Sequence, residues 1–151
     1  MKTIIITGAS SGIGLAVALE LAQKQANIIG IGHDPKRSEL ALEQIRAAAP
    51  GVNVRFLSPE ANATMLCADL MQQREVLRVA AELSNILANE FDGKLDALIS
   101  NAGCVRSWYT TTEEGYEQQF ALNHLAGFLL TQQLLPFLKR ASGRVILTGS
   151  G

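Results

Sequence analysis

The sequence predicts an α/β fold in which helices cover both faces of a doubly wound parallel sheet. Three observations support this prediction. Apolar runs of strand length alternate with segments of helical periodicity in the order βαβαβαβαβ. The runs are apolar at consecutive positions, which is typical of strands buried on both faces. Gly8, Gly12 and Gly14 separate the first run from the first helical segment, as in a turn that lets the backbone approach an anion.

The first half of the chain predicts two strand and helix units. Apolar residues recur four positions apart in the first helical segment, as on a helix that packs one stripe against a sheet. Pro35 suits the first turn of the second helix, and Pro50 with Gly51 is a stop signal. The expected strands are 2–7 and 27–32, and the apolar positions are Ile13, Val17 and Leu21 on the first helix and Leu42 and Ile45 on the second.

Two segments in the middle of the chain both resemble strands. The first is 52–57, and the second is 64–67, with Ser58 and Pro59 between them. The second runs directly into Asp69 and a long helical pattern, so it is favoured as the strand of the main sheet. The first is then expected to be an edge segment.

The second half predicts two long helices and two more strands. The first of these helices has apolar residues at spacings of three or four, and the second is unusually apolar. The apolar positions of the first are Val76, Ala80, Leu83, Leu87 and Phe91, and the other elements are expected at 95–100 (strand), 113–140 (helix) and 144–148 (strand).

The composition bounds the size of the fold and the kind of ligand. With 151 residues, 48% of them hydrophobic, the chain can bury roughly 70% of its unfolded surface in one core, which predicts a single domain over 1–151. Lys and Arg together number 13 against 14 Asp and Glu, so the charge balance offers no basic field for nucleic acid or anionic lipid. A small-molecule ligand is expected.

The cysteines and the apolar runs indicate the compartment. Cys67 and Cys104 lie far apart and fit neither a metal-ligand spacing nor a disulfide scaffold, so both are interpreted as reduced thiols. The apolar stretch before Gly8 is too short for a signal-peptide core, and no run approaches the roughly 18 residues that cross a bilayer. We expect a soluble cytoplasmic protein without a membrane partner.

The glycine-rich turn and four later segments resemble one family. Thr-Gly-Ala-Ser-Ser-Gly-Ile-Gly at 7–14 is similar to the cofactor loop of the short-chain dehydrogenases/reductases, and Ala-Asp-Leu at 68–70, Asn-Ala-Gly at 101–103, Asn123 and Ser150 agree in order. The resemblance implies a Rossmann fold that binds a nicotinamide dinucleotide, truncated here after its fifth strand. The cofactor-binding residues that it implies are Gly8, Ser10, Ser11, Gly12, Ile13, Gly14, His33, Arg37, Asp69, Leu70, Asn101, Ala102 and Gly103.

Two of these positions carry further expectations. Asp69 matches the family's acidic residue near the adenine ring, although an aspartate there equally suits a helix N-cap. The amide of Asn101 can pin its loop to a neighbouring one. Ser100 stands where family members often have another asparagine.

The resemblance implies two catalytic positions. Ser150 matches the family's catalytic serine, which holds the substrate oxygen by a hydrogen bond. Asn123 matches an asparagine that supports a water-linked proton relay, whereas without the resemblance it would be expected to satisfy a local backbone group. His124 is left out of the site, because the family gives its position no catalytic role.

The family's acid/base pair has no match in the chain. It is a tyrosine with a lysine four residues later, and the cation lowers the phenol pKa from near 10. Tyr109 and Tyr116 do not fit, because Glu113 and Phe120 occupy the lysine positions. We therefore expect residues 1–151 alone to be inactive and to be an incomplete domain. The strand at 144–148 would then be a sheet edge and the apolar helix at 113–140 would lack a neighbour, so we also expect aggregation or self-association.

The end of the second strand bears on the choice between NAD and NADP. NAD-specific members of the family usually have an acidic residue there, and this chain has Gly32. Asp34 lies two residues later, at about the distance from the glycine loop that NAD sites use. His33, Lys36 and Arg37 surround it with potential positive charge, so NADP is favoured and NAD is kept as the alternative.

The remaining expectations concern activity and partners. The stretches 112–120 and 128–136 are similar to the retinol-dehydrogenase and protochlorophyllide-reductase branches of the family, which suggests a bulky apolar carbonyl or alcohol as substrate. A homo-oligomer is expected from the family. The alternative is a dinucleotide-binding module or sensor without chemistry. A phosphate-transferring P-loop is set aside, because Leu15 and Ala16 occupy its Lys and Ser/Thr positions.

Overall fold

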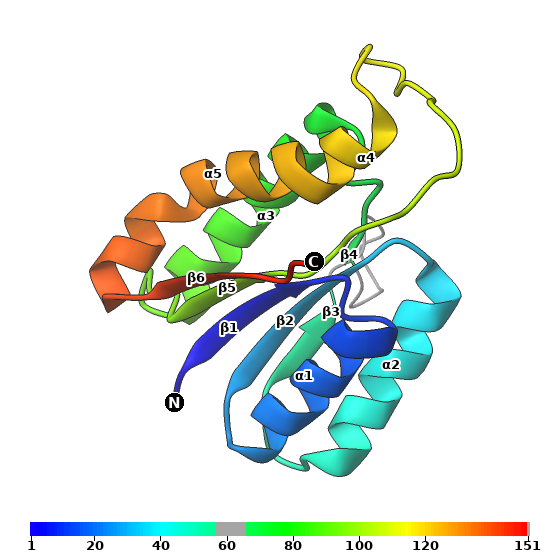
Figure 1. Ribbon diagram of the computed structural model, residues 1–151. Helices are drawn as coiled ribbons and strands as arrows, with labels where there is room; N and C mark the ends of the chain where they lie inside the picture. The colour runs from blue at the N-terminus through cyan, green and yellow to red at the C-terminus, as the bar shows by residue number, and fades with distance from the viewer. Residues whose placement is uncertain (57–65, 151) are drawn as a thin grey trace.

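The computed structural model describes residues 1–56 and 66–150 and contains one parallel sheet (Figure 1). The strand order is β3-β2-β1-β5-β6, and the short β4 also pairs with β2. Every pair of strands is parallel, which confirms the predicted fold class. The strands are β1 (Thr3–Thr7), β2 (Asn27–Gly32), β3 (Val54–Phe56), β4 (Leu66–Cys67), β5 (Ala97–Ser100) and β6 (Arg144–Leu147).

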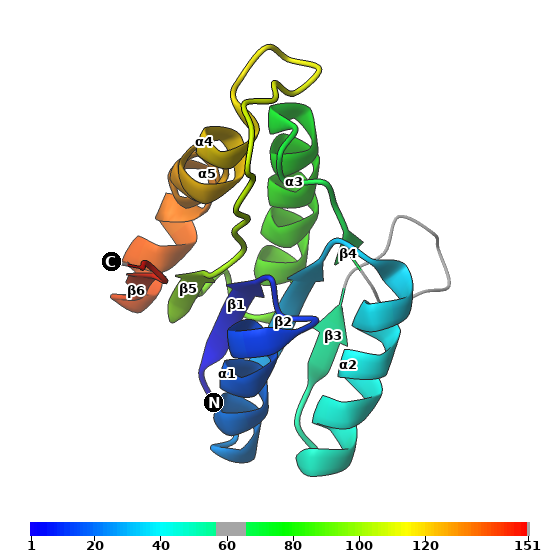
Figure 2. The same ribbon diagram turned by 45° about the vertical axis from the view of Figure 1, so that its right-hand side comes forward.

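Helices cover the two faces of the sheet in separate pairs. Helices α1 and α2 lie on one face, and α3 and α5 lie on the other (Figures 1 and 2). In the described part of the chain, no helix is long and apolar enough to cross a membrane. The helices are α1 (Gly12–Gln23), α2 (Pro35–Ala48), α3 (Gln73–Glu90), α4 (Gln118–Phe120) and α5 (Ala126–Ala141), with a π-helical turn (Ala121–Leu125) between the last two.

The consecutive isoleucines of β1 supply both layers of the core. Ile4 and Ile6 pack with α1 and α2, whereas Ile5 packs with α3 and α5. Ile5 and Ile6 are fully buried, and burial of such a side chain contributes about 1.5–3 kcal/mol to folding. Successive side chains of a strand point to opposite faces, so an uninterrupted apolar run requires helices on both sides.

The two candidate strands in the middle of the chain share one edge of the sheet. β3 pairs with Ile28, Ile29 and Gly30 of β2, and β4 pairs with Ile31 and Gly32. The first candidate, β3, lies at the edge of the sheet, as expected. The preference for the second candidate as the strand of the main sheet is wrong in part, because both candidates pair with β2 along the same edge. The positions of Ser58, Pro59 and 64–65 lie outside the described residues.

The helix expected at 113–140 begins later, at Gln118. The Glu117 carboxylate accepts hydrogen bonds from Gln119 N and Phe120 N, 3.0 and 2.7 Å away, and so caps the helix at this point. The residues before it form a turn closed by a bridge between Thr111 and Glu117, with Gly115 at a φ of +90°. A side chain at the start of a helix therefore sets the boundary, and the apolar pattern does not reveal it.

Candidate functional site

The candidate site lies at the carboxyl edge of the sheet, where the strand order changes direction. β1 has β2 on one side and β5 on the other. The chain leaving β1 enters α1 on one face, and the chain leaving β5 continues towards α4 on the opposite face (Figure 1). Loops that part in this way leave a crevice, which is the usual ligand site of an open parallel sheet.

The loop after β1 leads to a helix N-terminus beside this crevice. Gly8 adopts a φ of +69°, and its N–H donates to the Ile31 carbonyl at 2.9 Å, which turns the chain sharply. α1 then starts at Gly12, and the preceding Ser11 makes no side-chain capping hydrogen bond. No acidic residue lies in the first turn, so the positive end of the helix dipole is not compensated within it. This helix end suits an anionic group.

Gly12 and Gly14 have different roles in the loop. A Cβ added at Gly12, where φ is +55°, would meet no atom within 4 Å. A Cβ at Gly14 would collide with the Gly8 carbonyl and would lie 2.6 Å from Asn101 Nδ2. Gly12 therefore keeps the backbone accessible, whereas Gly14 allows α1 to pack closely behind the loop.

Thr7 joins this loop to the Asn101–Gly103 segment. Its buried hydroxyl oxygen accepts hydrogen bonds from Asn101 N and Ala102 N, both at 3.0 Å. Asn101 Nδ2 in turn donates to the Gly8 carbonyl at 3.4 Å, as expected for an amide that pins one loop to the next. Sequence reasoning did not single out Thr7 as a site residue. Its signal is a hydroxyl at the last position of a buried strand, immediately before a glycine.

A first cavity of about 510 Å³ lies between the ends of β1, β2 and β5. It brings together most of the residues expected to bind the cofactor, and it adds Asp34, Met71 and Arg106. The expected residues that line it are Gly8, Ser10, Ser11, His33, Arg37, Asp69, Leu70, Asn101, Ala102 and Gly103.

The end of β2 is too crowded for an acidic side chain. A Cβ at Gly32 would collide with the Ser38 hydroxyl and would lie 3.2 Å from Ser10 Oγ. The nearby Asp34 carboxylate caps α2, accepting from Lys36 N at 2.8 Å and Arg37 N at 3.1 Å. The hydrogen bond from the Arg37 N–H is the largest influence that lowers the pKa of Asp34 below its ordinary value of 3.8.

Asp69 lies in the first cavity but does not cap a helix. Its carboxylate accepts a hydrogen bond from Met71 N at 3.1 Å, which forms a local turn. α3 starts at Gln73, and the residue that precedes the helix is Gln72. The N-cap interpretation of Asp69 is therefore wrong.

A second cavity of about 750 Å³ adjoins the first at the Asn101–Gly103 segment. It brings Ile13 together with Ser150 and Asn123, the two expected catalytic residues. His124, which sequence analysis leaves out of the site, also lines it and stacks on Phe120 and Phe128 with ring centroids 5.2 and 6.3 Å away. The sequence signal for this stack is the spacing of four between aromatic rings on a helix.

Asn123 fixes the loop that follows Gly103. Its Oδ1 accepts from Cys104 N at 2.8 Å, and its Nδ2 donates to the Cys104 carbonyl at 2.9 Å. The residue lies in the π-helical turn, a local irregularity that is frequent at functional sites. The side chain thus satisfies backbone groups of another segment, and its role in a proton relay stays a prediction.

Comparison with known proteins identifies the family. The sequence profile described as short chain dehydrogenase matches residues 2–151. The chain belongs to the short-chain dehydrogenase family. The chain is 40% identical to human Retinol dehydrogenase 13 over 146 residues, which are 96% of the chain and 40% of the relative. It is 38% identical to Retinol dehydrogenase 14 of Mus musculus over 150 residues, which are 99% of the chain and 44% of the relative.

Solved structures agree with this assignment. A short-chain dehydrogenase from Sphingobium yanoikuyae in complex with NADPH is 28% identical, with a TM-score of 0.77, and the match covers 99% of this chain and 54% of that one. An alcohol dehydrogenase from Thermococcus sibiricus complexed with 5-hydroxy-NADP is 25% identical, with a TM-score of 0.76 and coverage of 99% and 58%. The expected likeness to the retinol-dehydrogenase branch is confirmed. The chain spans less than half the length of the two curated relatives named above.

Proposed function

We propose that the chain forms the cofactor-binding part of an NADP-dependent oxidoreductase that transfers hydride between nicotinamide and a carbonyl or alcohol. The observation that carries this proposal is the meeting of the two cavities at Asn101–Gly103, beside the free N-terminus of α1. A dinucleotide is long enough to occupy both cavities, with its diphosphate between them.

The residues present fit the diphosphate of such a nucleotide. The N-terminus of α1 has no capping side chain and no acidic residue in its first turn, and the backbone at Gly12 is open. Ser10 and Ser11 add hydroxyl groups at the edge of the first cavity. Backbone N–H groups and a helix dipole together favour a phosphate at this position.

The chain's own groups define what happens at the second cavity. When bound, the nicotinamide nucleotide supplies or accepts the hydride. The Ser150 hydroxyl donates a hydrogen bond to a carbonyl oxygen, or accepts one from an alcohol, and so holds the reacting oxygen. Asn123 holds the Cys104 backbone, which keeps the Asn101–Gly103 segment in place between the two cavities.

Neither tyrosine of residues 1–151 suits the role of the acid/base. Tyr109 and Tyr116 are 77% and 40% exposed, and neither lines either cavity. Neither has a lysine four residues later to lower its pKa. We therefore propose that residues 1–151 alone bind nucleotide without turning over substrate.

NADP is proposed over NAD because of the first cavity. Gly32 leaves no room for the acidic side chain that would repel a 2′-phosphate, and the Asp34 carboxylate is engaged by two backbone N–H groups. Arg37 lines the same cavity and can face a phosphate. Structural relatives bound to NADPH and 5-hydroxy-NADP support the same choice.

A bulky apolar substrate is proposed from the second cavity. Its lining includes Ile13, Phe128, Val145 and Leu147, all of which are at least 40% exposed. Apolar groups of a ligand gain free energy by covering such surface. The names of the curated relatives, retinol dehydrogenases, support the same class of substrate.

Nucleotide titration tests the proposal directly. We expect NADPH to raise the thermal stability of the protein more than NADH at equal concentration, because stabilisation grows with the ratio of ligand concentration to dissociation constant. Gly12→Val should abolish both responses, since its side chain occupies the approach to the helix end. Gly51→Val is the matched control, because Gly51 also has a positive φ, +87°, and open space around it, but lies in the turn after α2.

Two outcomes would contradict the proposal. No response to either nucleotide would exclude a dinucleotide site, and a stronger response to NADH would overturn the preference for NADP. The alternative, a nucleotide-binding module without chemistry, predicts binding but no substrate-dependent oxidation of NADPH by the full-length protein. A cytoplasmic location and a homo-oligomer are also proposed, the first from the free thiol of Cys104 and the second from the family.

A further inference from the structure

A long loop begins in the wall of the first cavity and is held by hydrogen bonds at both ends. We call residues 104–117 the strap. At its start, the Cys104 backbone exchanges two hydrogen bonds with the Asn123 side chain. At its end, Glu117 caps α4. Between these two points the strap passes beside the beginning of α3 (Figure 2).

Glu114 fastens the strap to the N-terminus of α3. Its carboxylate accepts a hydrogen bond from Gln73 N and another from Arg74 N, the latter at 3.3 Å and from 40 residues away in sequence. Gln72, the residue before α3, makes no side-chain capping hydrogen bond, so Glu114 supplies the cap from a distance. Glu113 adds an exposed ion pair with Arg74 at 2.8 Å, a type of contact that contributes little.

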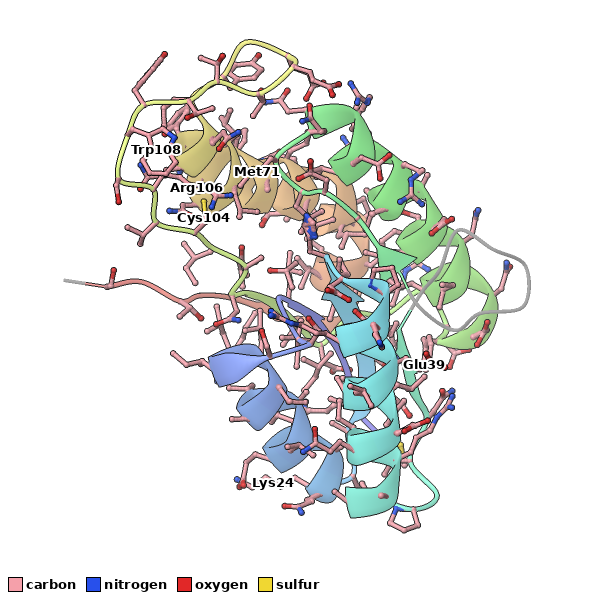
Figure 3. All side chains as sticks on the ribbon, turned by 90° about the vertical axis from the view of Figure 1, so that its right-hand side faces the viewer. Lys24, Glu39, Met71, Cys104, Arg106 and Trp108 are labelled. Carbon is pink, nitrogen blue, oxygen red and sulfur yellow. The ribbon has the colours of Figure 1, made fainter. Side chains whose placement is uncertain are left out.

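The strap carries Arg106 into the wall of the first cavity. Arg106 lines that cavity together with Ser10 and Ser11 of the loop before α1, and Figure 3 shows it beside Cys104 and near Met71. Its charge opposes the effect of burial, which raises the pKa of the Cys104 thiol. Within the described residues, Arg106 makes neither an ion pair nor a side-chain hydrogen bond.

The acidic and basic side chains around the first cavity differ in their hydrogen bonding. Asp34 and Asp69 both accept backbone hydrogen bonds, which hold their carboxylates against the chain. Arg37, on α2, and Arg106, on the strap, both line the cavity. An arginine without an ion pair that lines the same cavity as the loop before a helix N-terminus is suited to a phosphate, because the guanidinium group and the helix end both attract an anion.

We propose that Arg106 is an additional nucleotide-binding residue that contacts a phosphate of the dinucleotide, and that Glu114 positions it by holding the strap on α3. This inference rests on the proposed function and extends it to a residue outside the glycine loop and the end of β2. The shared chemistry is a phosphate group, and the dinucleotide offers two kinds, the diphosphate and the 2′-phosphate of NADP.

Binding of NADPH and NADH to Arg106→Gln tests the contact in the full-length protein. We expect the dissociation constant for NADPH to rise about tenfold, as for loss of one charge-assisted hydrogen bond at a partly solvated site. If the dissociation constant for NADH rises equally, Arg106 contacts the diphosphate, which both nucleotides have. If the dissociation constant for NADH does not change, Arg106 contacts the 2′-phosphate, which only NADPH has. Arg106→Lys should recover part of the loss. The matched control is Lys139→Gln, which removes the same charge from the last turn of α5, at the opposite edge of the sheet.

A double-mutant cycle tests the positioning role of Glu114. Glu114→Ala should weaken NADPH binding in the wild-type background but not in the Arg106→Gln background, because its effect passes through Arg106. Glu114→Gln, which keeps an acceptor oxygen, should restore part of the affinity, and Glu113→Gln should have little effect. A purely structural role of Glu114 would weaken binding equally in both backgrounds.

The possible failures are distinguishable. If the wild-type protein binds NADPH and Arg106→Gln binds it equally well, the inference is overturned and the proposed function stands. If the wild-type protein binds neither nucleotide, both are overturned. If Glu114→Ala has the same effect with and without Arg106, the contact stands and the positioning role is overturned.

Discussion

At the scale of single residues, buried polar atoms decide how the two main loops of the site are held. Thr7 is 3% exposed, and its hydroxyl serves two backbone N–H groups of the neighbouring loop. Asn123 plays the same part for Cys104 from the other side. In both cases a side-chain oxygen accepts the hydrogen bonds of loop N–H groups that have no partner strand. The loops can therefore border an open crevice while these N–H groups stay paired.

Thr7→Val tests how much this junction contributes. The variant keeps the shape of the side chain but leaves two N–H groups without their acceptor, so we expect the free energy of unfolding to fall by about 2 kcal/mol. Thr7→Ser keeps the oxygen and should cost about 1 kcal/mol or less. Chemical denaturation of the three proteins measures the difference, and equal losses in both variants would show that the hydroxyl is not what matters.

At the scale of elements, side chains at helix starts fix boundaries that apolar periodicity leaves open. Asp34 begins α2 and Glu117 begins α4, each through two backbone N–H groups. α3 takes its cap from Glu114, a residue far away in sequence. The local caps have the residue type and position that a sequence can reveal, whereas the cap of α3 depends on where the strap passes.

The capping charge of Asp34 predicts a specific dependence on pH. Its pKa is lowered in the folded protein, so its contribution to stability is complete above the ordinary value of 3.8 and is lost as the pH falls through the folded value. The melting temperature of the wild type should exceed that of Asp34→Ala at neutral pH, and the gap should narrow below about pH 3.8.

Asp34→Asn provides the control for this measurement. Asparagine is also a good N-cap but carries no titrating charge. The gap between Asp34→Asn and Asp34→Ala should therefore change little over the same pH range. A gap between wild type and Asp34→Ala that stays constant into acid would mean that the carboxylate is not the group responsible.

At the scale of the whole molecule, the two edges of the described sheet differ in cover. β3 and β4 share one edge beside α2, whereas β6 at the other edge exposes Val145, Ile146 and Leu147 to 40%, 46% and 72%. Val145 and Leu147 also line the second cavity, whereas Ile146 does not. An uncovered apolar edge strand favours pairing with another chain.

Residues 1–151 expressed alone should therefore self-associate. Ile146→Lys places a charge on the edge strand and should raise the concentration at which association begins by about tenfold, equivalent to about 1.4 kcal/mol. Leu40→Lys, at an exposed position on α2, is the matched control and should not change it. Sedimentation velocity over a range of concentrations measures the effect. A monomer at all concentrations would contradict the expectation.

The sequence by itself determined the parallel sheet with helices on both faces, because consecutive isoleucines such as Ile4, Ile5 and Ile6 point to both faces of a strand and helical segments alternate with such strands to cover each face. It also determined the glycine loop, whose spacing reflects local backbone geometry. Only the tertiary structure decided that β3 and β4 share an edge and that Thr7 and Asn123 hold the loops. It alone also decided that Arg106 lines the first cavity and that Glu114 binds the start of α3. These contacts join segments far apart in the chain, and their partners are set by how the elements pack rather than by local residue patterns.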